Sequence, residues 1–242
     1  MGTLTANRWY RAVVTNSPCA SANSNSVKVT VTVCFNCGTS TVTFNYNGSS
    51  VTYGTVVANN GKCWLDRNLG ASRVATSRTD ANAYGDLFQW GRGADGHQIR
   101  TSGTTGTNSL TDNPGHSNFI TEGSSPYDWR VPQNNNLWQG VSGTNNPCPS
   151  GWRLPTQAEW EAEKGSWSSH NAAGAFASPL KLPVAGYRIC GNGSLSNVGS
   201  RGCYWSSTID GTNSRLLNFY SSGANMFSDY RASGLSVRCI KD

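Results

Sequence analysis

The side chains of this sequence that could do chemistry are its cysteines, its histidines and a group of glutamates. Cys34 and Cys37 form a CxxC pair, the spacing found in zinc knuckles and in redox-active dithiols. No second CxxC or histidine pair follows, and no βαβ pattern surrounds the pair, so we expect neither a metal site nor a redox centre there. Disulfides of these two cysteines to Cys19, to each other or to Cys63 are the alternatives that we prefer.

Glu159, Glu161 and Glu163 suggest acid–base chemistry by their residue type. They fall early in a predicted helix, where the helix dipole alone favours carboxylates, so we expect them to be structural. His97 and His116 lie in a segment rich in Gly, Ser, Thr and Asn, and we expect both to be exposed polar residues. The residues therefore predict no catalytic group, no metal and no other cofactor.

The composition indicates an extracellular, β-rich protein. Of 242 residues, 27 are Gly and 9 are Trp, and only 13% are charged, a mixture that suits turns and pleated surfaces. The 8 cysteines favour an oxidising compartment with some disulfides. The net charge of +6 comes from scattered arginines, so we expect no nucleic-acid groove. No apolar run approaches the roughly 20 residues of a membrane span, and the N-terminus MGTLTANRWY lacks the apolar region of a signal peptide.

The length allows one large core and a small appendage. Residues 1–38 contain two alternating segments, 9–15 and 26–33, which predict a β-hairpin. The hairpin resembles the last two strands of the immunoglobulin-like repeats of bacterial surface proteins. Because an isolated hairpin is marginally stable in water, we expect it to pack on the main domain or to belong to a longer multidomain protein. Residues 39–242 form the predicted main domain.

The main domain is expected to begin with a second hairpin. The alternating residues 41–57 contain Asn47 and Gly48 at the position of a tight turn. In the following GKCWLDRNL segment, the neighbours Asp66 and Arg67 predict a structural ion pair.

A long irregular insertion separates this hairpin from the second half of the domain. Residues 79–92 are expected to start a short helix, and residues 93–147 are rich in turn-forming residues. A loop of this length in a compact domain is usually functional or is held by sparse apolar anchors. The anchors are present as Phe119, Ile120, Trp129, Leu137 and Trp138. We therefore expect an ordered irregular insertion.

The clearest local signal is the segment CPSGWRLPTQAEWEAEK, residues 148–164. Thr156 is a good N-cap, and Glu159 three positions later completes a capping box, so a helix is predicted over residues 157–164. Pro155 ends the short strand before it.

The C-terminal residues 186–242 combine a regular apolar frame with positions that follow no period. The frame residues that a β-rich core would bury are Trp205, Leu217, Phe219, Val237 and Cys239. Between them, aromatic, acidic, small and aliphatic residues are mixed without order. This pattern indicates a fixed frame with an outward surface that is free to vary.

Several motifs in order carry a resemblance to a known family. The segment 148–164, followed by LKLPVAGYR, GCYWSST and GLSVRCIKD, resembles the Fibrobacter succinogenes major paralogous domain over residues 53–242. That family is a bacterial branch of the C-type lectin fold. The resemblance implies an α+β domain with two helices, a twisted antiparallel sheet, many irregular loops, and chain ends that lie close together.

Two other groups with this fold make different predictions. The formylglycine-generating enzymes carry RLPTEAEWE, which is similar to residues 153–161, but their catalytic cysteine pair precedes the final strand, where this chain has Cys203 alone. Calcium-dependent lectins use Glu-Pro-Asn, Gln-Pro-Asp or Trp-Asn-Asp tripeptides, and the chain contains none of these. The resemblance therefore supports neither an enzyme nor a calcium-bound sugar site.

The C-terminal stretch also resembles the variable region of proteins diversified by retroelements, which use this fold for display. In those systems adenine mutation acts mainly on Asn codons and can never yield Lys, Gln, Glu, Met or Trp. Each candidate variable position here holds a residue that such a codon can reach. These positions are Ile189, Cys190, Gly191, Ser196, Arg201, Cys203, Asp210, Leu216, Tyr220, Gly223, Phe227, Ser228, Asp229, Tyr230 and Ser233.

The same resemblance separates the scaffold from the variable residues. Cys190 and Cys203 would be products of diversification, able to oxidise together only if they are adjacent, whereas Cys148 and Cys239 flank fixed motifs and would be structural. The other scaffold residues that we expect are Trp152, Trp160, Trp205, Asn218 and Arg231.

The sequence thus predicts a non-enzymatic display protein on a cell or virion surface. Its variable region, within residues 186–242, would bind an extracellular protein or glycan, and the sequence specifies neither that ligand nor the oligomeric state. A secreted adhesin or carbohydrate-associated module without diversification is the first alternative. An oxidoreductase related to the formylglycine-generating enzymes is the second.

Overall fold

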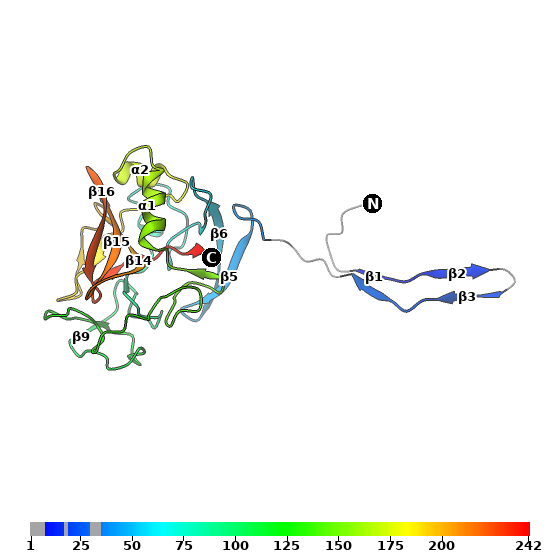
Figure 1. Ribbon diagram of the computed structural model, residues 1–242, viewed down its shortest axis with the longest axis horizontal. Coiled ribbons are helices and arrows are strands. Elements are labelled where there is room, and N and C mark those ends of the chain that lie inside the picture. Colours follow the sequence, from blue (N-terminus) through cyan, green and yellow to red (C-terminus); the bar gives the residue numbers. More distant parts are fainter. Residues whose placement is uncertain (1–7, 17–18, 30–34) are drawn as a thin grey trace. The chain divides into compact units, whose positions relative to one another are not determined.

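The computed structural model describes residues 8–16, 19–29 and 35–242. The chain divides into an N-terminal unit, Met1–Asn36, and a C-terminal unit, Cys37–Asp242. The boundary lies two residues before the predicted one, because Cys37 is bonded to Cys63 and so belongs to the second unit. Figure 1 shows the elements of both units.

The N-terminal unit is an antiparallel hairpin whose two arms are each interrupted. One arm consists of β1 (Arg8–Tyr10) and β2 (Val13–Asn16), and the other consists of β3 (Cys19–Asn23) and β4 (Val27–Val29). β1 pairs with β4, and β2 pairs with β3. The return arm begins at Cys19, earlier than the predicted residue 26, because the small residues of β3 pair with β2. Residues 30–33 and Cys34 lie outside the described residues, so the predicted pairings of Cys34 have no structural outcome.

The C-terminal unit is an α+β structure in which both ends of the chain segment meet in one sheet. This five-stranded sheet has the order β11-β18-β7-β6-β5. Its strands are β5 (Thr41–Tyr46), β6 (Ser49–Val57), β7 (Cys63–Leu65), β11 (Trp152–Arg153) and β18 (Ile240–Lys241). Asn47 and Gly48 both have positive φ, as the predicted tight turn between β5 and β6 requires. The predicted ion pair is also present, with Arg67 Nε 2.7 Å from Asp66 Oδ1.

A second sheet of three long strands follows the order of the chain. It consists of β14 (Gly202–Asp210), β15 (Asn213–Tyr220) and β16 (Gly223–Tyr230), all antiparallel. Shorter strands form a four-stranded sheet and a parallel pair in the described residues. These are β8 (Phe88–Gln89), β12 (Tyr187–Arg188), β13 (Leu195–Ser196) and β17 (Gly234–Leu235), and the pair β9 (Thr104–Thr105) and β10 (Phe119–Ile120).

Two α-helices are present in the described residues, α1 (Gln157–Gly165) and α2 (Ala172–Ala177). The predicted capping box is confirmed: the Thr156 hydroxyl accepts from the Glu159 backbone N–H, and the Glu159 carboxylate accepts from the Thr156 N–H. Glu159 also forms a bidentate ion pair with Arg153, which supports its structural role. Figure 1 shows α1 beside β14, β15 and β16. No helix in the described ranges is both long and apolar enough to span a membrane.

The predicted apolar frame forms the core of the unit. Trp205, Leu217, Phe219, Val237 and Cys239 are all fully buried. Indole N–H groups tie this core to the main chain, because Trp160 donates to the Trp205 carbonyl at 3.1 Å and Trp205 donates to the Phe88 carbonyl at 2.8 Å. Such a hydrogen bond fixes the orientation of the buried indole ring and its distance from the strand that supplies the carbonyl.

The insertion of residues 93–147 is ordered, as predicted. Each of its anchors is buried, namely Phe119, Ile120, Trp129, Leu137 and Trp138. The predicted helix in residues 79–92 is largely wrong. It shortens to one 3-10 turn, η1 (Ala81–Ala83), because Gly85 at φ +66° brings the chain so close to Leu69 that a Cβ there would lie 2.3 Å from the Leu69 carbonyl oxygen.

The prediction that His97 is exposed is wrong. The ring is completely buried: its Nδ1 lies 2.6 Å from Asp95 Oδ1, and its Nε2 accepts from the Gln89 backbone N–H. These contacts define a neutral imidazole with its proton on Nδ1. The polar residues around His97 in the sequence gave no sign that its ring is buried against the backbone of Gln89.

His97 predicts a pH effect on stability. Burial, together with the charges of Arg92 and Arg188, lowers the pKa of His97 from 6.5 to about 4, against the opposing effect of Asp95. The unfolded chain therefore binds a proton between these pH values that the folded chain refuses, so stability falls as the pH drops from 6.5 to about 4. Urea titrations of the wild type and His97→Asn across this window should show a steeper loss for the wild type. Parallel pH profiles would contradict the assignment.

Candidate functional site

A hollow of about 320 Å³ lies on one face of the three-stranded sheet. We call it the strand hollow. Its lining residues are Tyr187, Ile189, Cys190, Arg201, Cys203, Leu216, Asn218, Phe227, Asp229, Tyr230 and Ser233. Side chains alternate between the two faces of a strand. Leu217 and Phe219 pack in the same core cluster as Trp160 of α1, so Leu216 and Asn218 between them face the opposite side, into the hollow.

The wall made by Ile189 and Cys190 is held in place by Arg188. The Arg188 guanidinium is buried and donates to the carbonyls of Gly193 and Ser102 at 2.6 Å each. It also lies 4.3 Å over the ring of Phe119. Burial lowers the pKa of Arg188, and the carbonyl dipoles take the place of water around its charge. This arginine fixes the loop that follows β12.

The opposite wall depends on the insertion. The Tyr230 ring stacks on Tyr127 with centroids 4.1 Å apart. The next residue, Arg231, is buried, lies 4.6 Å over the Trp90 ring and donates to Asn135 Oδ1 at 2.7 Å. The insertion therefore supports the end of β16 from behind.

Opposite charges and protonated thiols line the hollow. Burial raises the pKa of the Asp229 carboxyl, while Arg201 lies 5.5 Å over the Tyr220 ring at the neighbouring edge. Burial also raises the pKa of Cys203 to about 12 and raises that of Cys190. Both cysteines are free thiols and stay protonated at neutral pH, which is the opposite of what a thiolate nucleophile needs. The hollow therefore combines aromatic rings, two charged side chains and neutral thiols.

Most of the predicted variable residues meet at this hollow. They are Ile189, Cys190, Arg201, Cys203, Leu216, Phe227, Asp229, Tyr230 and Ser233. Tyr220 and Gly223 pair with each other at the end of the same sheet, beside Arg201. Phe227 is 60% exposed and Tyr230 is 38% exposed, so both aromatic rings offer surface to a ligand.

Three of these residues are almost completely buried. Cys203, Leu216 and Ser233 are 5%, 2% and 3% exposed. They form the floor of the hollow, where residues of the sheet and of the neighbouring loops cover their side chains. The expectation that each variable side chain points to solvent is therefore wrong for the floor.

The remaining predicted positions lie elsewhere. Ser228 donates to Asp210 Oδ2 and accepts from Arg215, whose Nε donates to Gln157 at the start of α1. Strand alternation thus turns Ser228 away from the hollow that its neighbours Phe227 and Asp229 line. Gly191 and Ser196 do not line the hollow either.

The predicted scaffold residues are buried with one exception. Trp152, Trp160, Trp205, Arg231, Cys148 and Cys239 are buried, and the last two form a disulfide. Asn218 is instead half-buried and lines the hollow, where its Oδ1 lies 3.7 Å from Cys203 Sγ.

Sequence reasoning also missed Tyr187 and Tyr127. Tyr187 alternates with the buried Arg188 in β12, a period-2 signal that places its side chain on the hollow side. Tyr127 gave no such signal, because it lies in the insertion and its partner Tyr230 is far away in the sequence.

Potential metal ligands do not cluster in the part of the chain that the structure describes. No group of three or more His, Cys, Asp or Glu side chains that could hold a metal ion occurs among the residues that the structure describes.

Comparison with known proteins concerns the N-terminal unit. A family model described as a domain of unknown function, DUF8696, matches residues 1–33. No curated protein and no solved structure matches the chain. The family match therefore covers the N-terminal hairpin and includes none of the residues that line the strand hollow.

Proposed function

We propose that the chain is a non-enzymatic display protein of the C-type lectin fold, whose strand hollow binds an extracellular protein or glycan and is diversified by a retroelement. The observation that carries this proposal is the convergence of the candidate variable residues. They come from the loop after β12, from all three strands of the sheet and from the turn after β16, yet they line one hollow. In the sequence they are the irregular positions between the frame residues, and each holds a residue that a mutated Asn codon can reach.

The fold proposal is supported by the way the C-terminal unit closes. β18 at the end of the chain pairs with β7 near the start of the unit and with β11, which directly precedes α1. The disulfide Cys148–Cys239 lies beside this junction. The resemblance in the sequence implies this meeting of chain ends together with two helices and abundant loops.

The hollow suits a macromolecular surface by its chemistry. Tyr187, Phe227 and Tyr230 supply rigid aromatic contact area, and Arg201 and Asp229 supply opposite charges. Aromatic anchors beside small adaptable residues are typical of antibody paratopes. Side chains on this face can change while the strand ladders, made by backbone groups, keep their register.

The DNA around the coding region tests diversification directly. The proposal expects a near-copy of the segment encoding the last part of the chain, differing mainly at adenines, and a reverse transcriptase gene nearby. Finding neither would leave the undiversified adhesin or carbohydrate-associated module as the better description.

A display library tests binding by the hollow. Randomising the hollow positions outside the buried floor with the codon NNC, including Phe227 and Tyr230, should leave most clones folded and yield binders to hen lysozyme as a model target. In a selected clone, replacing one aromatic anchor with Ala should weaken binding about 30-fold, corresponding to the roughly 2 kcal/mol of a hot spot. The matched control library randomises exposed positions outside the hollow, at Asn192, Ser194, Ser221 and Ser222. Equal numbers of binders from both libraries would refute a dedicated binding face.

The oxidoreductase alternative has one observation in its favour, since the free thiols of Cys190 and Cys203 both line the hollow. An enzyme of that kind should oxidise a cysteine-containing peptide in a copper-dependent reaction, and the replacement Cys203→Ser should abolish it. Oxidation that survives this replacement, or is never observed, removes this alternative.

A further inference from the structure

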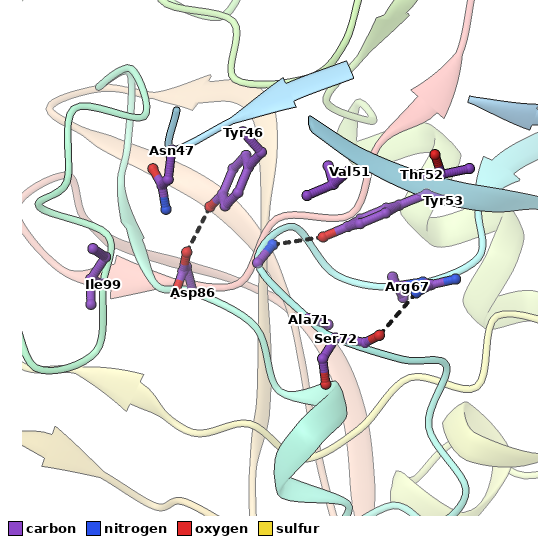
Figure 2. Close-up of a pocket in the computed structure, with 11 residues that line it drawn as sticks. Tyr46, Asn47, Val51, Thr52, Tyr53, Arg67, Ala71, Ser72, Asp86 and Ile99 are labelled. Carbon is purple, nitrogen blue, oxygen red and sulfur yellow. Dashed lines mark hydrogen bonds between the residues drawn. The ribbon is translucent and has the colours of Figure 1, made fainter. Parts of the chain in front are cut away.

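A second and larger cavity lies away from the strand hollow. It measures about 480 Å³ and is lined by Tyr46, Asn47, Val51, Thr52, Tyr53, Arg67, Gly70, Ala71, Ser72, Asp86 and Ile99. We call it the tyrosine pocket. Figure 2 shows Tyr46 and Tyr53 descending from the β5–β6 hairpin, with Asp86 and Arg67 on the loops beneath them. It shares no lining residue with the strand hollow.

Asp86 contributes a carboxylate without a contacting cation. The Tyr46 hydroxyl donates to Asp86 Oδ2 at 2.7 Å, as Figure 2 shows. Among the described residues, this is the only side-chain hydrogen bond to Asp86, and no Lys, Arg or His lies within ion-pair distance of it. The charge of Arg100 acts on Asp86 without direct contact, since the Arg100 guanidinium donates to the Ala185 carbonyl at 2.8 Å and lies over the Tyr84 ring. Burial raises the pKa of the Asp86 carboxyl, which records the cost of leaving its charge poorly compensated.

Arg67 lines the same pocket, but its charge is already compensated. Its Nε and Nη2 donate to the two carboxylate oxygens of Asp66 at 2.7 and 2.9 Å, and its Nη1 donates to the Ser72 carbonyl. Its guanidinium carbon lies 4.8 Å from the centre of the Tyr53 ring. Because Asp66 neutralises Arg67, Asp86 gives the pocket a net negative charge.

The backbone is built to leave this space open. Gly70 has φ +81°, and a Cβ there would lie 2.4 Å from Asp86 Oδ2. The Gly70 N–H donates to the Tyr53 hydroxyl at 3.0 Å, so the loop fixes Tyr53 at the same point. Glycine therefore permits a close approach of the loop to the carboxylate, and any other residue would push Asp86 aside.

We propose that the tyrosine pocket binds an organic cation, a primary ammonium or a guanidinium group, with Asp86 as its counter-ion. The carboxylate retains acceptor positions beyond the one that Tyr46 uses. The tyrosine rings offer faces that attract a cation, an interaction that Tyr53 already makes with Arg67. A divalent metal is a poorer match, since Ca²⁺ takes about 6 to 8 oxygen ligands and the pocket presents a single uncompensated carboxylate.

Nuclear magnetic resonance titration of the full chain tests this proposal. The probes are putrescine, N-acetyl-lysine amide and N-acetyl-arginine amide, with N-acetyl-citrulline amide as the neutral analogue of the arginine probe. The cationic probes should shift the backbone amide signals of Gly70 and Ala71, which line the pocket. The citrulline probe should bind about tenfold more weakly or worse, the factor expected for one charged hydrogen bond. Tighter binding of putrescine indicates free amines as ligands, and tighter binding of the amino-acid amides indicates basic side chains of a polypeptide.

Two variants keep the result specific. Asp86→Asn should weaken binding of the arginine probe about tenfold or more, whereas Glu161→Gln, an exposed carboxylate on α1, should leave it unchanged. Ile99→Lys adds a competing cation at a rim position that is 42% exposed, and should weaken binding without altering Asp86. Equal affinity for citrulline and arginine probes, full binding by a folded Asp86→Asn variant, or no response to any cationic probe would overturn the proposal.

Discussion

Replacing Cys148 and Cys239 together with alanine is expected to lower the free energy of unfolding by about 4 to 5 kcal/mol. The bond joins residues 91 positions apart, so its loss frees a long loop in the unfolded chain. It also joins the segment before α1 to the strand region at the end of the chain. Urea unfolding monitored by tryptophan fluorescence, without reductant, measures the difference.

The other disulfide provides the matched control. Cys37–Cys63 closes a loop with a separation of only 26 residues, and removing it should cost about 3.5 kcal/mol by the same relation. The order of the two variants is the decisive result. If the shorter loop proves the more costly to release, chain entropy is not the main contribution of these bonds.

Arg238→Met is expected to destabilise the fold by at least about 3 kcal/mol, because buried acceptors that lose their donor cost roughly 1 to 3 kcal/mol each. The Arg238 side chain is buried and makes no ion pair with a carboxylate in the described part of the chain. Its guanidinium instead donates twice to Asn68 Oδ1 and also to the carbonyls of Leu65 and Leu180. Burial lowers the pKa of Arg238, yet these acceptors hold the charged form.

An exposed arginine and a double variant make this prediction specific. Arg78→Met should change the free energy of unfolding by less than about 0.5 kcal/mol, as is usual for surface substitutions. Asn68→Leu combined with Arg238→Met should cost less than the sum of the single variants, since the two residues satisfy each other. Additive costs measured by urea unfolding would show that Arg238 acts through packing alone.

Local signals in the sequence predicted local structure well. Thr156 and Glu159 specify a helix start by contacts within one turn, and Asn47 with Gly48 specify a hairpin by their own backbone preferences. The burial of His97 could not be predicted in this way. Its partners, Asp95 and Gln89, look like ordinary loop residues until the insertion folds around them.

The candidate site was predictable as a set of residues but not as a shape. Phe227 and Asp229 could be identified because they interrupt the apolar frame and hold residue types that one codon pattern allows. Strand register and loops from other parts of the chain decide that Leu216 lies in the floor of the hollow. They also decide that Ser228 lies on the side of α1. Composition carries no information about either.

The unbroken pairing of β15 with β16 has a consequence for how this protein can evolve. Tyr220 to Asn213 oppose Gly223 to Tyr230 without a bulge, so a single inserted or deleted codon would exchange the two faces of a strand. Leu217 and Phe219 would then leave the helix side and the hollow would receive core residues. A substitution, by contrast, leaves each position on the same face of its strand. Natural variants of this chain should therefore differ in many letters within these strands and hardly ever in length.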